Sequence, residues 1–568
     1  MKRFALVPRL RTAPFFFFPL FLVACSVLEK AVTHGEKPQL PEGVKPVQEE
    51  VKVVEKGHRK LGPNRFIKNE AGIWELYVEG GPYERGRAIG KLIRPLLGEQ
   101  ERIFVRRIKK MIPSESYLDF LRYFVGFFTR RLDHYVDRDQ QLEILGISKA
   151  ASSEFDHIGP PFYRMLNYHA AHDIGHALQN MELVSSPMVG CTSFSVKGSA
   201  SKDGELLVGR NFDFHMGDPF SKNKIAAFYR PEKGHPFMMV TWPGMTGAVS
   251  GMNKAGLTVT LNAAKSGIPK KVGTPVSLIG REILQNASTI EEAYEVAARY
   301  KSFVAETFLV ASAKDGESAV IEKTPQRMSL FRPGKDRVVC SNHFQSETFE
   351  DRKLTQEHKK ANPTSERYRR LHQLLDRSEP LDPRSAADLL RDHKGLDDKN
   401  IGLGNERALN QFVAHHSIIF DPKERKVWLS AFPYQLGRYV AYDLDSVFAE
   451  GGPQASFRAQ GEDIPPSELL TDGTYERFKR FKELRGRIIQ RIKQEQASLP
   501  DSSLVQNFID SNPQYFEVYM LLGDLYRQKK RYGKAVEYYA TALNKAVPRA
   551  SQREHIKEGL QKALRKEK

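Results

Sequence analysis

A cysteine follows a glycine at the start of a predicted strand, and this cysteine is the candidate nucleophile of the chain. Gly190 precedes Cys191, and residues 191–196 are predicted to form a strand that turns at residues 201–204 into a second strand. The second strand ends with Arg210 and Asp213. The pattern predicts a thiol whose reactivity is set by a cation and an anion on the neighbouring strand.

A cut between Gly190 and Cys191 would give Cys191 a free α-amine. The pKa of such an amine is about 7.7 and that of a thiol about 8.5, so the amine can act as general base for its own thiol near neutral pH. Before the cut, the same thiol can attack the Gly190 carbonyl and form a thioester, which water hydrolyses. Two alternatives stay open: Cys191 is a small buried hydrophobe, or Arg210 and Asp213 form a salt bridge across the hairpin.

Four short motifs, in order along the chain, carry a family resemblance. They lie at residues 191–193, at residues 209–213, at residues 251–257 with 261–262, and at Ser341 and Asn342. Together they resemble the acyl-coenzyme A:6-aminopenicillanic acid acyltransferase family, an autoproteolytic group related to choloylglycine hydrolases and acid ceramidases. Residues 81–87 are similar to the pro-segment of that group, and the resemblance extends over about residues 70–435.

The resemblance implies a role for each of six side chains and a cut between Gly190 and Cys191. It implies that Cys191 is the nucleophile, that Asp213 binds the α-amine, and that Arg210 favours the thiolate form of the thiol. It also implies that Asn262 donates its amide to the oxyanion, that Asn342 positions the amine or the leaving nitrogen, and that Arg367 corresponds to a late arginine of the family. It implies no metal and no cofactor.

The fold class that the resemblance implies is α+β. It is the N-terminal nucleophile (Ntn) hydrolase sandwich of two antiparallel sheets between helical layers, with a helical module added at the C-terminus. Strand hairpins predicted up to residue 430, with helices at residues 277–285 and 291–300, agree with it. The reaction implied is cleavage of a linear amide, or acyl transfer from an amide or thioester to an amine, through an acyl-enzyme on Cys191. The identity of this small-molecule substrate stays open.

The N-terminus resembles an export signal. Basic residues are followed by an apolar run at residues 15–21, which is shorter than a membrane span requires. Residues 22–25 resemble a bacterial lipoprotein box, which implies lipid attachment at Cys25 and a protein anchored to the cell envelope, with the outer membrane favoured. An uncleaved anchor and an ordinary secretory signal are the alternatives. Residues 26–65 are predicted to be a disordered tether.

The rest of the chain divides into four predicted parts. These are a mainly helical pro-segment or N-terminal subunit (66–190), the Ntn catalytic core (191–450), a helical linker (451–500) and a helical repeat with a basic tail (501–568). Residues 518–526 and 532–543 match one tetratricopeptide (TPR) repeat, which predicts a TPR-like module and a possible protein partner. A generic helical hairpin is the alternative.

Charge and histidine spacing leave further hypotheses. The formal net charge of +18 favours an anionic neighbour such as a membrane surface, unless the charge belongs to linkers and tail. No nucleic-acid motif is found, and nucleic acid is not expected as a partner. His169, His172 and His176 share a helical face and could bind zinc in a metal-dependent hydrolase. A catalytically inactive lipid-anchored scaffold on the same fold is another alternative. Cys340 is expected to be a core thiol.

Overall fold

The structure of the chain is a computed structural model. It describes residues 38–40, 49–111, 131–171, 173–175, 190–265, 267, 271–334, 336–449, 457–494 and 498–567. The predicted signal at residues 1–25, including Cys25, and the two histidines His172 and His176 lie outside the described residues. Within the described ranges, no helix combines the length and the apolar character that a membrane crossing requires.

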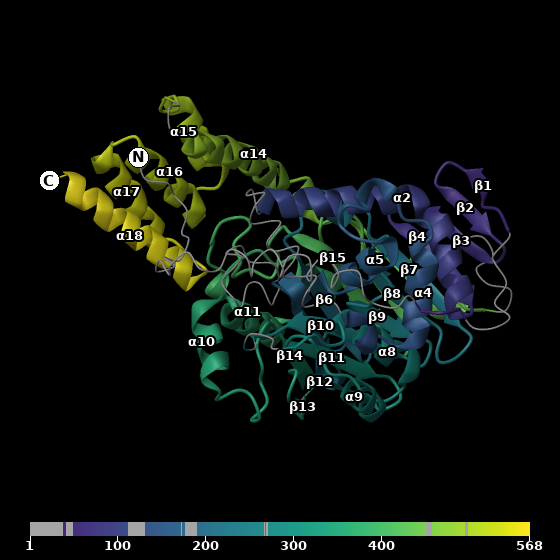
Figure 1. The fold of residues 1–568 in the computed structure, drawn as a ribbon. Coiled ribbons are helices and arrows are strands. Elements are labelled where there is room, and N and C mark those ends of the chain that lie inside the picture. Colours follow the sequence, from purple (N-terminus) through teal and green to yellow (C-terminus); the bar gives the residue numbers. More distant parts are fainter. Residues whose placement is uncertain are drawn as a thin grey trace, which may run out of the picture.

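Two β-sheets form the centre of the part of the chain between residues 52 and 443, the sheet part (Figure 1). In spatial order, the larger sheet contains β1 (Lys52–Glu55), β2 (His58–Leu61), β3 (Asn64–Lys68), β4 (Trp74–Gly80), β7 (Ile225–Pro231), β8 (Phe237–Thr241), β9 (Ser250–Asn253), β10 (Leu257–Ala263), β11 (Glu306–Ser312), β12 (Glu317–Lys323) and β13 (Met328–Phe331). The smaller sheet contains β14 (Arg337–Cys340), β5 (Thr192–Val196), β6 (Leu207–Asp213), β15 (Ala414–Asp421), β16 (Lys426–Ser430) and β17 (Tyr439–Asp443). Neighbouring strands pair antiparallel, except that β4 and β7 are parallel.

The two sheets pack face to face, and helices cover both outer faces. On β6, Val208 joins the apolar cluster between the sheets, whereas its neighbour Leu207 packs on the opposite face, as the two-residue period of a strand requires. The outer face of the larger sheet is covered by α2 (Pro82–Met111), α4 (Arg138–Ser148), α5 (Pro161–His169), α8 (Val276–Asn286) and α9 (Ile290–Ala298). The outer face of the smaller sheet is covered by α11 (Thr364–Arg377) and α12 (Pro383–Leu390). The predicted α+β sandwich is therefore confirmed.

A buried ionic contact ties the N-terminal helices to the core. A Cβ atom on Gly86 would lie 2.1 Å from the Glu143 carbonyl oxygen, so the glycine lets α2 and α4 cross closely. Arg85 and Arg281 both bind the Glu143 carboxylate, at 2.6 and 3.0 Å, and all three side chains are buried. Burial alone would raise the pKa of Glu143, but the two guanidinium groups lower it to about 2. The contact joins α2, α4 and α8.

The predicted disordered tether ends earlier than expected. Residues 52–68 form β1, β2 and β3 at the edge of the larger sheet, so the prediction of disorder is wrong for residues 52–65. Phe66 is buried and stacks on Trp74 of β4, with ring centroids 4.6 Å apart. The many charged residues of β1 and β2 conceal the strand pattern, and such residues are common on edge strands because they hinder further pairing.

The C-terminal helices form a separate group beside the sheets, at the yellow end of the chain in Figure 1. They are α14 (Thr474–Lys493), α15 (Ser502–Ser511), α16 (Phe516–Gln528), α17 (Tyr532–Leu543) and α18 (Ala550–Glu567). A Cβ on Gly523 would lie 2.6 Å from the Tyr539 ring, so the small and aromatic positions of the repeat pattern meet. The core of the group includes the apolar side of α14 and extends to Phe412 and Tyr434 of the sheet part.

Candidate functional site

The β5–β6 hairpin positions the candidate nucleophile. Cys191 directly precedes β5, and the antiparallel register places Ser193 opposite Arg210. Arg210 Nη2 lies 3.6 Å from Cys191 Sγ. At the end of β6, the backbone carbonyl of Asp213 accepts a hydrogen bond of 3.0 Å from the Gly190 N–H. The hairpin therefore brings the thiol, the guanidinium group and Asp213 together.

Arg210 is held by neutral groups. Its guanidinium group donates to the Ser250 hydroxyl and to two backbone carbonyls, those of Val249 and Leu261, and it lies 4.7 Å above the centre of the Phe212 ring. Among the described residues it forms no ion pair with a carboxylate, which leaves the alternative of a salt bridge with Asp213 without support. Its positive charge is therefore available to stabilise a thiolate.

The Cys191 thiol is fully buried. Burial raises the pKa of the thiol to about 11, although the Arg210 guanidinium group lowers it. The thiol belongs to an apolar cluster with Phe212, Phe214, Met216, Phe220, Trp242 and Val249. In the uncut chain the sulfur is thus protonated at neutral pH and needs a base before it becomes a strong nucleophile.

Gln411 connects the Gly190 carbonyl to the Asp213 carboxylate. Its Nε2 lies 2.9 Å from the Gly190 carbonyl oxygen and 3.0 Å from Asp213 Oδ2. The second carboxylate oxygen, Asp213 Oδ1, is buried and has no hydrogen-bond partner among the described residues. Burial raises the pKa of Asp213 to about 7, against the influence of Arg367 and Arg210. Sequence analysis missed Gln411, because no motif surrounds this loop residue.

Asn262 lies at the end of β10, against the nucleophile strand. Its Oδ1 accepts a hydrogen bond of 3.0 Å from Ser193 Oγ, and its Nδ2 donates to the Cys340 carbonyl at 3.1 Å. Asn262, which is predicted to stabilise the oxyanion, is therefore adjacent to β5. In the uncut chain, both the oxygen and the nitrogen of its side-chain amide form hydrogen bonds within the fold.

Arg367 on α11 joins the nucleophile strand to Asn342. Its Nε donates to Thr192 Oγ1 at 3.2 Å, and its Nη2 donates to Asn342 Oδ1 at 2.6 Å. Asn342 in turn donates to the Ala263 carbonyl, directly after Asn262, at 3.0 Å. The six predicted catalytic residues thus form one connected group around the start of β5.

Glu306 is a further acidic residue near this group, and sequence analysis missed it. It is the first residue of β11, and both of its carboxylate oxygens are buried without a hydrogen-bond partner among the described residues. Burial raises the pKa of Glu306 well above its usual range, with the Arg210 charge acting in the opposite direction. An acid at the head of a buried apolar strand is the sequence signal that could have identified it.

The alternative of a zinc site at His169, His172 and His176 receives no support from the described residues. His169 is buried, with Nδ1 2.7 Å from the Met165 carbonyl oxygen and Nε2 2.8 Å from the Thr246 backbone nitrogen, so the fold uses both ring nitrogens. The described ranges contain no group of three or more histidine, cysteine or acidic side chains that could hold a metal ion. Cys340 is buried between the sheets, as expected of a core thiol.

The family model described as "Acyl-coenzyme A:6-aminopenicillanic acid acyl-transferase" matches residues 199–431. The sheets, the helical layers and this match define the class of protein, an Ntn hydrolase sandwich. Residues 199–431, less than half of the chain, therefore resemble the acyl-coenzyme A:6-aminopenicillanic acid acyltransferase family, as the sequence motifs predicted. The match includes Arg210, Asp213, Asn262, Asn342 and Arg367, and Cys191 lies just before it.

Two relatives match part of the chain. The first is the N-acylethanolamine-hydrolyzing acid amidase of Caenorhabditis elegans, 25% identical over 228 residues, which are 39% of this chain and 59% of that protein. The second is an uncharacterized protein of Archaeoglobus fulgidus, 24% identical over 274 residues, which are 46% of this chain and 45% of that protein. The chain therefore matches little more than half of the first relative and less than half of the second.

Two solved structures are also similar. The Caenorhabditis elegans N-acylethanolamine-hydrolyzing acid amidase ortholog has a TM-score of 0.30 and 19% identity, over 41% of this chain and 93% of that chain. A mutant of the conjugated bile acid hydrolase from Clostridium perfringens has a TM-score of 0.31 and 14% identity, over 45% of this chain and 92% of that chain.

Proposed function

We propose that the protein is an autoproteolytic cysteine Ntn amidohydrolase or acyltransferase. Cys191 forms an acyl-enzyme with a linear amide or an acyl thioester. The observation that carries this proposal is the contact of 3.6 Å between Arg210 Nη2 and Cys191 Sγ, directly beside the Gly190 carbonyl that Gln411 binds. A cation beside the sulfur and a donor on the carbonyl both favour attack of the thiol on this peptide bond.

The first reaction is cleavage of the chain itself. The Cys191 sulfur bonds to the Gly190 carbonyl carbon, the bond from that carbon to the Cys191 nitrogen breaks, and the thiol proton ends on the new α-amine. Gln411 Nε2 donates to the oxygen that carries the developing negative charge. Water then hydrolyses the thioester, which releases the Gly190 carboxylate and restores the thiol.

The second reaction is turnover of the substrate. The new α-amine has an ordinary pKa of about 7.7 and takes the thiol proton as general base. The free Asp213 Oδ1 accepts a hydrogen bond from this amine, while Arg210 stabilises the thiolate. Asn262 donates to the oxyanion, and Arg367 holds Asn342 for the leaving nitrogen. An acyl-enzyme forms, and water or an amine then accepts the acyl group.

The apolar cluster that contains Cys191 favours an apolar acyl group. It includes six apolar side chains, three of them phenylalanines and one a tryptophan, and burying an apolar chain against such side chains is favourable. The amidase relative from Caenorhabditis elegans is named for hydrolysing N-acylethanolamines, so amides of apolar acyl chains are the first substrates to screen.

The sequence also supports an exported, lipid-anchored protein. Cys25 takes the lipid and holds the enzyme to the cell envelope, and the TPR-like module is available for a protein partner. Blocking lipoprotein signal processing should leave the signal attached and increase the mass of the chain, whereas an unchanged mass would contradict lipidation at Cys25.

Trapping the acyl-enzyme tests the proposed function. Purified protein is mixed with an N-acyl amide, quenched in acid during turnover and analysed by mass spectrometry. We expect the acyl mass on the fragment that begins with Cys191, and we expect no adduct on a Cys191→Ala variant. Amide cleavage that continues in the Cys191→Ala variant would contradict the proposal.

A further inference from the structure

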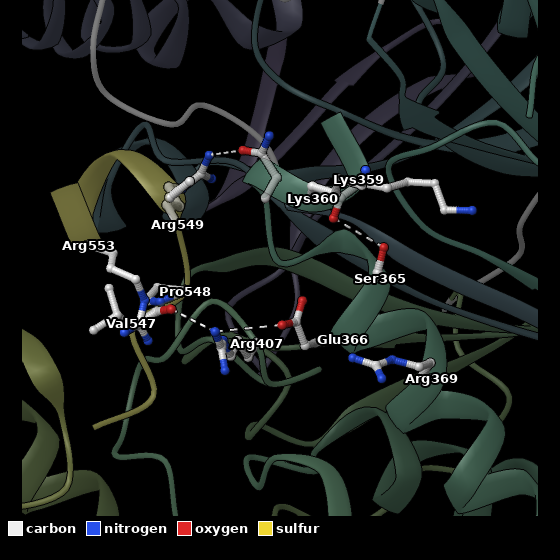
Figure 2. Close-up of a pocket in the computed structure, with 12 residues that line it drawn as sticks. Lys359, Lys360, Ser365, Glu366, Arg369, Arg407, Val547, Pro548, Arg549 and Arg553 are labelled. Atoms are coloured by element: carbon white, nitrogen blue, oxygen red, sulfur yellow. Dashed lines mark hydrogen bonds and ion pairs between the residues drawn. The ribbon is translucent and has the colours of Figure 1, made fainter. Parts of the chain in front are cut away.

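A pocket of about 310 Å³ lies between the sheet part and the C-terminal helices. Its walls come from α10 (Lys353–Ala361), from α11, from the loop that carries Arg407, and from the start of α18 (Figure 2). Its volume falls in the range of small-ligand sites. None of the residues predicted to be catalytic is among its lining residues.

The lining of this pocket is strongly basic. Its cationic residues are Lys359, Lys360, Arg369, Arg407, Arg549 and Arg553, and Glu366 is its one acidic residue. Three of the cations have a carboxylate within 4 Å: Lys359 pairs with Glu350, Arg407 with Glu366 and Arg549 with Glu406. Lys360, Arg369 and Arg553 have no ion-pair partner among the residues that the structure describes. The pocket therefore carries an excess of about three positive charges.

Arg407 lies at the centre of this positive charge. Its Nη2 donates to the Val547 carbonyl at 2.7 Å, and its Nε is buried without a hydrogen-bond partner among the described residues. Burial lowers the pKa of Arg407; Glu366 raises it, and the like charges of Arg553 and Arg369 lower it further. Three guanidinium groups thus repel one another, and a bound anion would relieve the repulsion.

The start of α18 adds to the attraction for an anion. Pro548, Arg549 and Ala550 line the pocket, and Ala550 is the first residue of this 18-residue helix. The first N–H groups of a helix lack partners within the helix and carry a partial positive charge. The basic side chains and the helix start therefore favour the same kind of ligand.

We propose that this pocket binds the phosphate group of a phosphate monoester or a diphosphate, held by Arg369, Arg407 and Arg553. The planar guanidinium fork matches two phosphate oxygens at once, and a phosphate monoester carries a charge of about −1.5 to −2 at neutral pH, which fits the unbalanced charge of the pocket. The phosphate belongs to a soluble ester or to the headgroup of an anionic lipid. The proposal does not depend on the proposed function, because the lining excludes the Cys191 site.

The test uses the full-length chain and inorganic pyrophosphate as the probe, at constant ionic strength. Calorimetric titration and thermal unfolding are compared for wild type, for the double variant Arg369→Gln with Arg553→Gln, and for the control Arg299→Gln with Lys301→Gln. The control removes two exposed charges directly after α9, which are not among the lining residues of the pocket, and so matches the change in net charge. Neither arginine of the test variant forms an ion pair among the described residues, so folding should be preserved.

We expect pyrophosphate to bind wild type and the control equally and to raise their Tm, because a ligand of the native state stabilises it. The test variant should bind at least about tenfold more weakly, since charge-assisted hydrogen bonds to phosphate are strong. Phosphatidylcholine vesicles with and without phosphatidic acid, whose headgroup is a phosphate monoester, separate the two sources of the phosphate. Binding to the vesicles with phosphatidic acid but not to pyrophosphate assigns the site to a lipid headgroup. Binding to neither probe, or equal binding by the test variant, would overturn the proposal.

Discussion

Gln411 Nε2 donates to the carbonyl oxygen of Gly190 at a distance of 2.9 Å. The same nitrogen donates to Asp213 Oδ2 at 3.0 Å, so one side chain joins the carbonyl to be attacked and the carboxylate that is to hold the new amine. Gln411 is buried, and the contact therefore forms away from bulk water, where an amide donor stabilises a developing negative charge most effectively.

We predict that Gln411→Leu slows self-cleavage by about two to three orders of magnitude, because removal of one oxyanion donor typically costs about 3 kcal/mol of barrier lowering. The measurement is the rate at which the uncut chain disappears after synthesis in a cell-free system. Gln435→Leu is the control, since Gln435 is equally buried and donates to the Leu390 carbonyl instead. Equal cleavage rates in the two variants would remove Gln411 from the mechanism.

The Arg210 charge should set the reactivity of the Cys191 thiol. Because the guanidinium group lowers the thiol pKa, Arg210→Gln should raise it, shift alkylation by iodoacetamide to higher pH and reduce kcat/KM by tenfold or more. Arg210→Lys keeps the charge and should retain part of the reactivity. Alkylation of the cleaved protein is followed against pH by mass spectrometry, and an unchanged pH profile in Arg210→Gln would contradict this role.

The two fragments should stay together after the cut. The N-terminal fragment supplies β1 to β4 to the larger sheet. Its Glu143 binds both Arg85 of the same fragment and Arg281 of the C-terminal fragment. Glu143→Gln should lower the free energy of unfolding by about 3–5 kcal/mol, because it leaves two buried charges without their partner. Glu154→Gln, which breaks an exposed ion pair with Arg102, should cost at most about 1 kcal/mol. Native mass spectrometry measures whether the fragments stay together, and denaturant titration measures the free energies of unfolding. Fragments that separate without denaturant would contradict the prediction.

Asp213 should make the uncut chain less stable at high pH. Its pKa is raised from an ordinary value of 3.8 to about 7, so its protonated form stabilises the folded chain at low pH, and this stability is lost as the pH rises from about 4 through 7. In a Cys191→Ala background, Asp213→Asn should reduce this loss of unfolding free energy by at most about 4 kcal/mol, since one pKa unit corresponds to about 1.4 kcal/mol. Urea titrations at pH 4 and pH 8 measure the free energy of unfolding of each variant. An unchanged pH dependence in Asp213→Asn would show that Asp213 is ionised in the folded chain.

The parts of the site that local pattern determines could be predicted from the sequence. The β5–β6 hairpin follows from two short strands around a turn, and the hairpin register alone brings Cys191 and Arg210 together. Arg367 could be predicted as a site residue only from the family resemblance, because α11 is distant from β5 in the chain. The structure connects the two through Thr192.

Gln411 and Glu306 could not be predicted in the same way. Gln411 lies in a loop, where no periodicity restricts its partners, and its contact to Gly190 spans 221 positions. Glu306 lies in a strand that is mostly apolar, and only the packing of the two sheets shows that its carboxylate has no hydrogen-bond partner among the described residues. The edge strands β1 to β3 were missed because their composition resembles that of a linker.

The most direct test of the central claim is the intact mass of the purified, folded chain. Cys191 is proposed to become an N-terminal nucleophile by cutting its own bond to Gly190. Wild type should therefore give two masses that correspond to fragments ending at Gly190 and beginning at Cys191, and Cys191→Ala should give one. A wild-type chain that stays whole while it is folded would contradict the account.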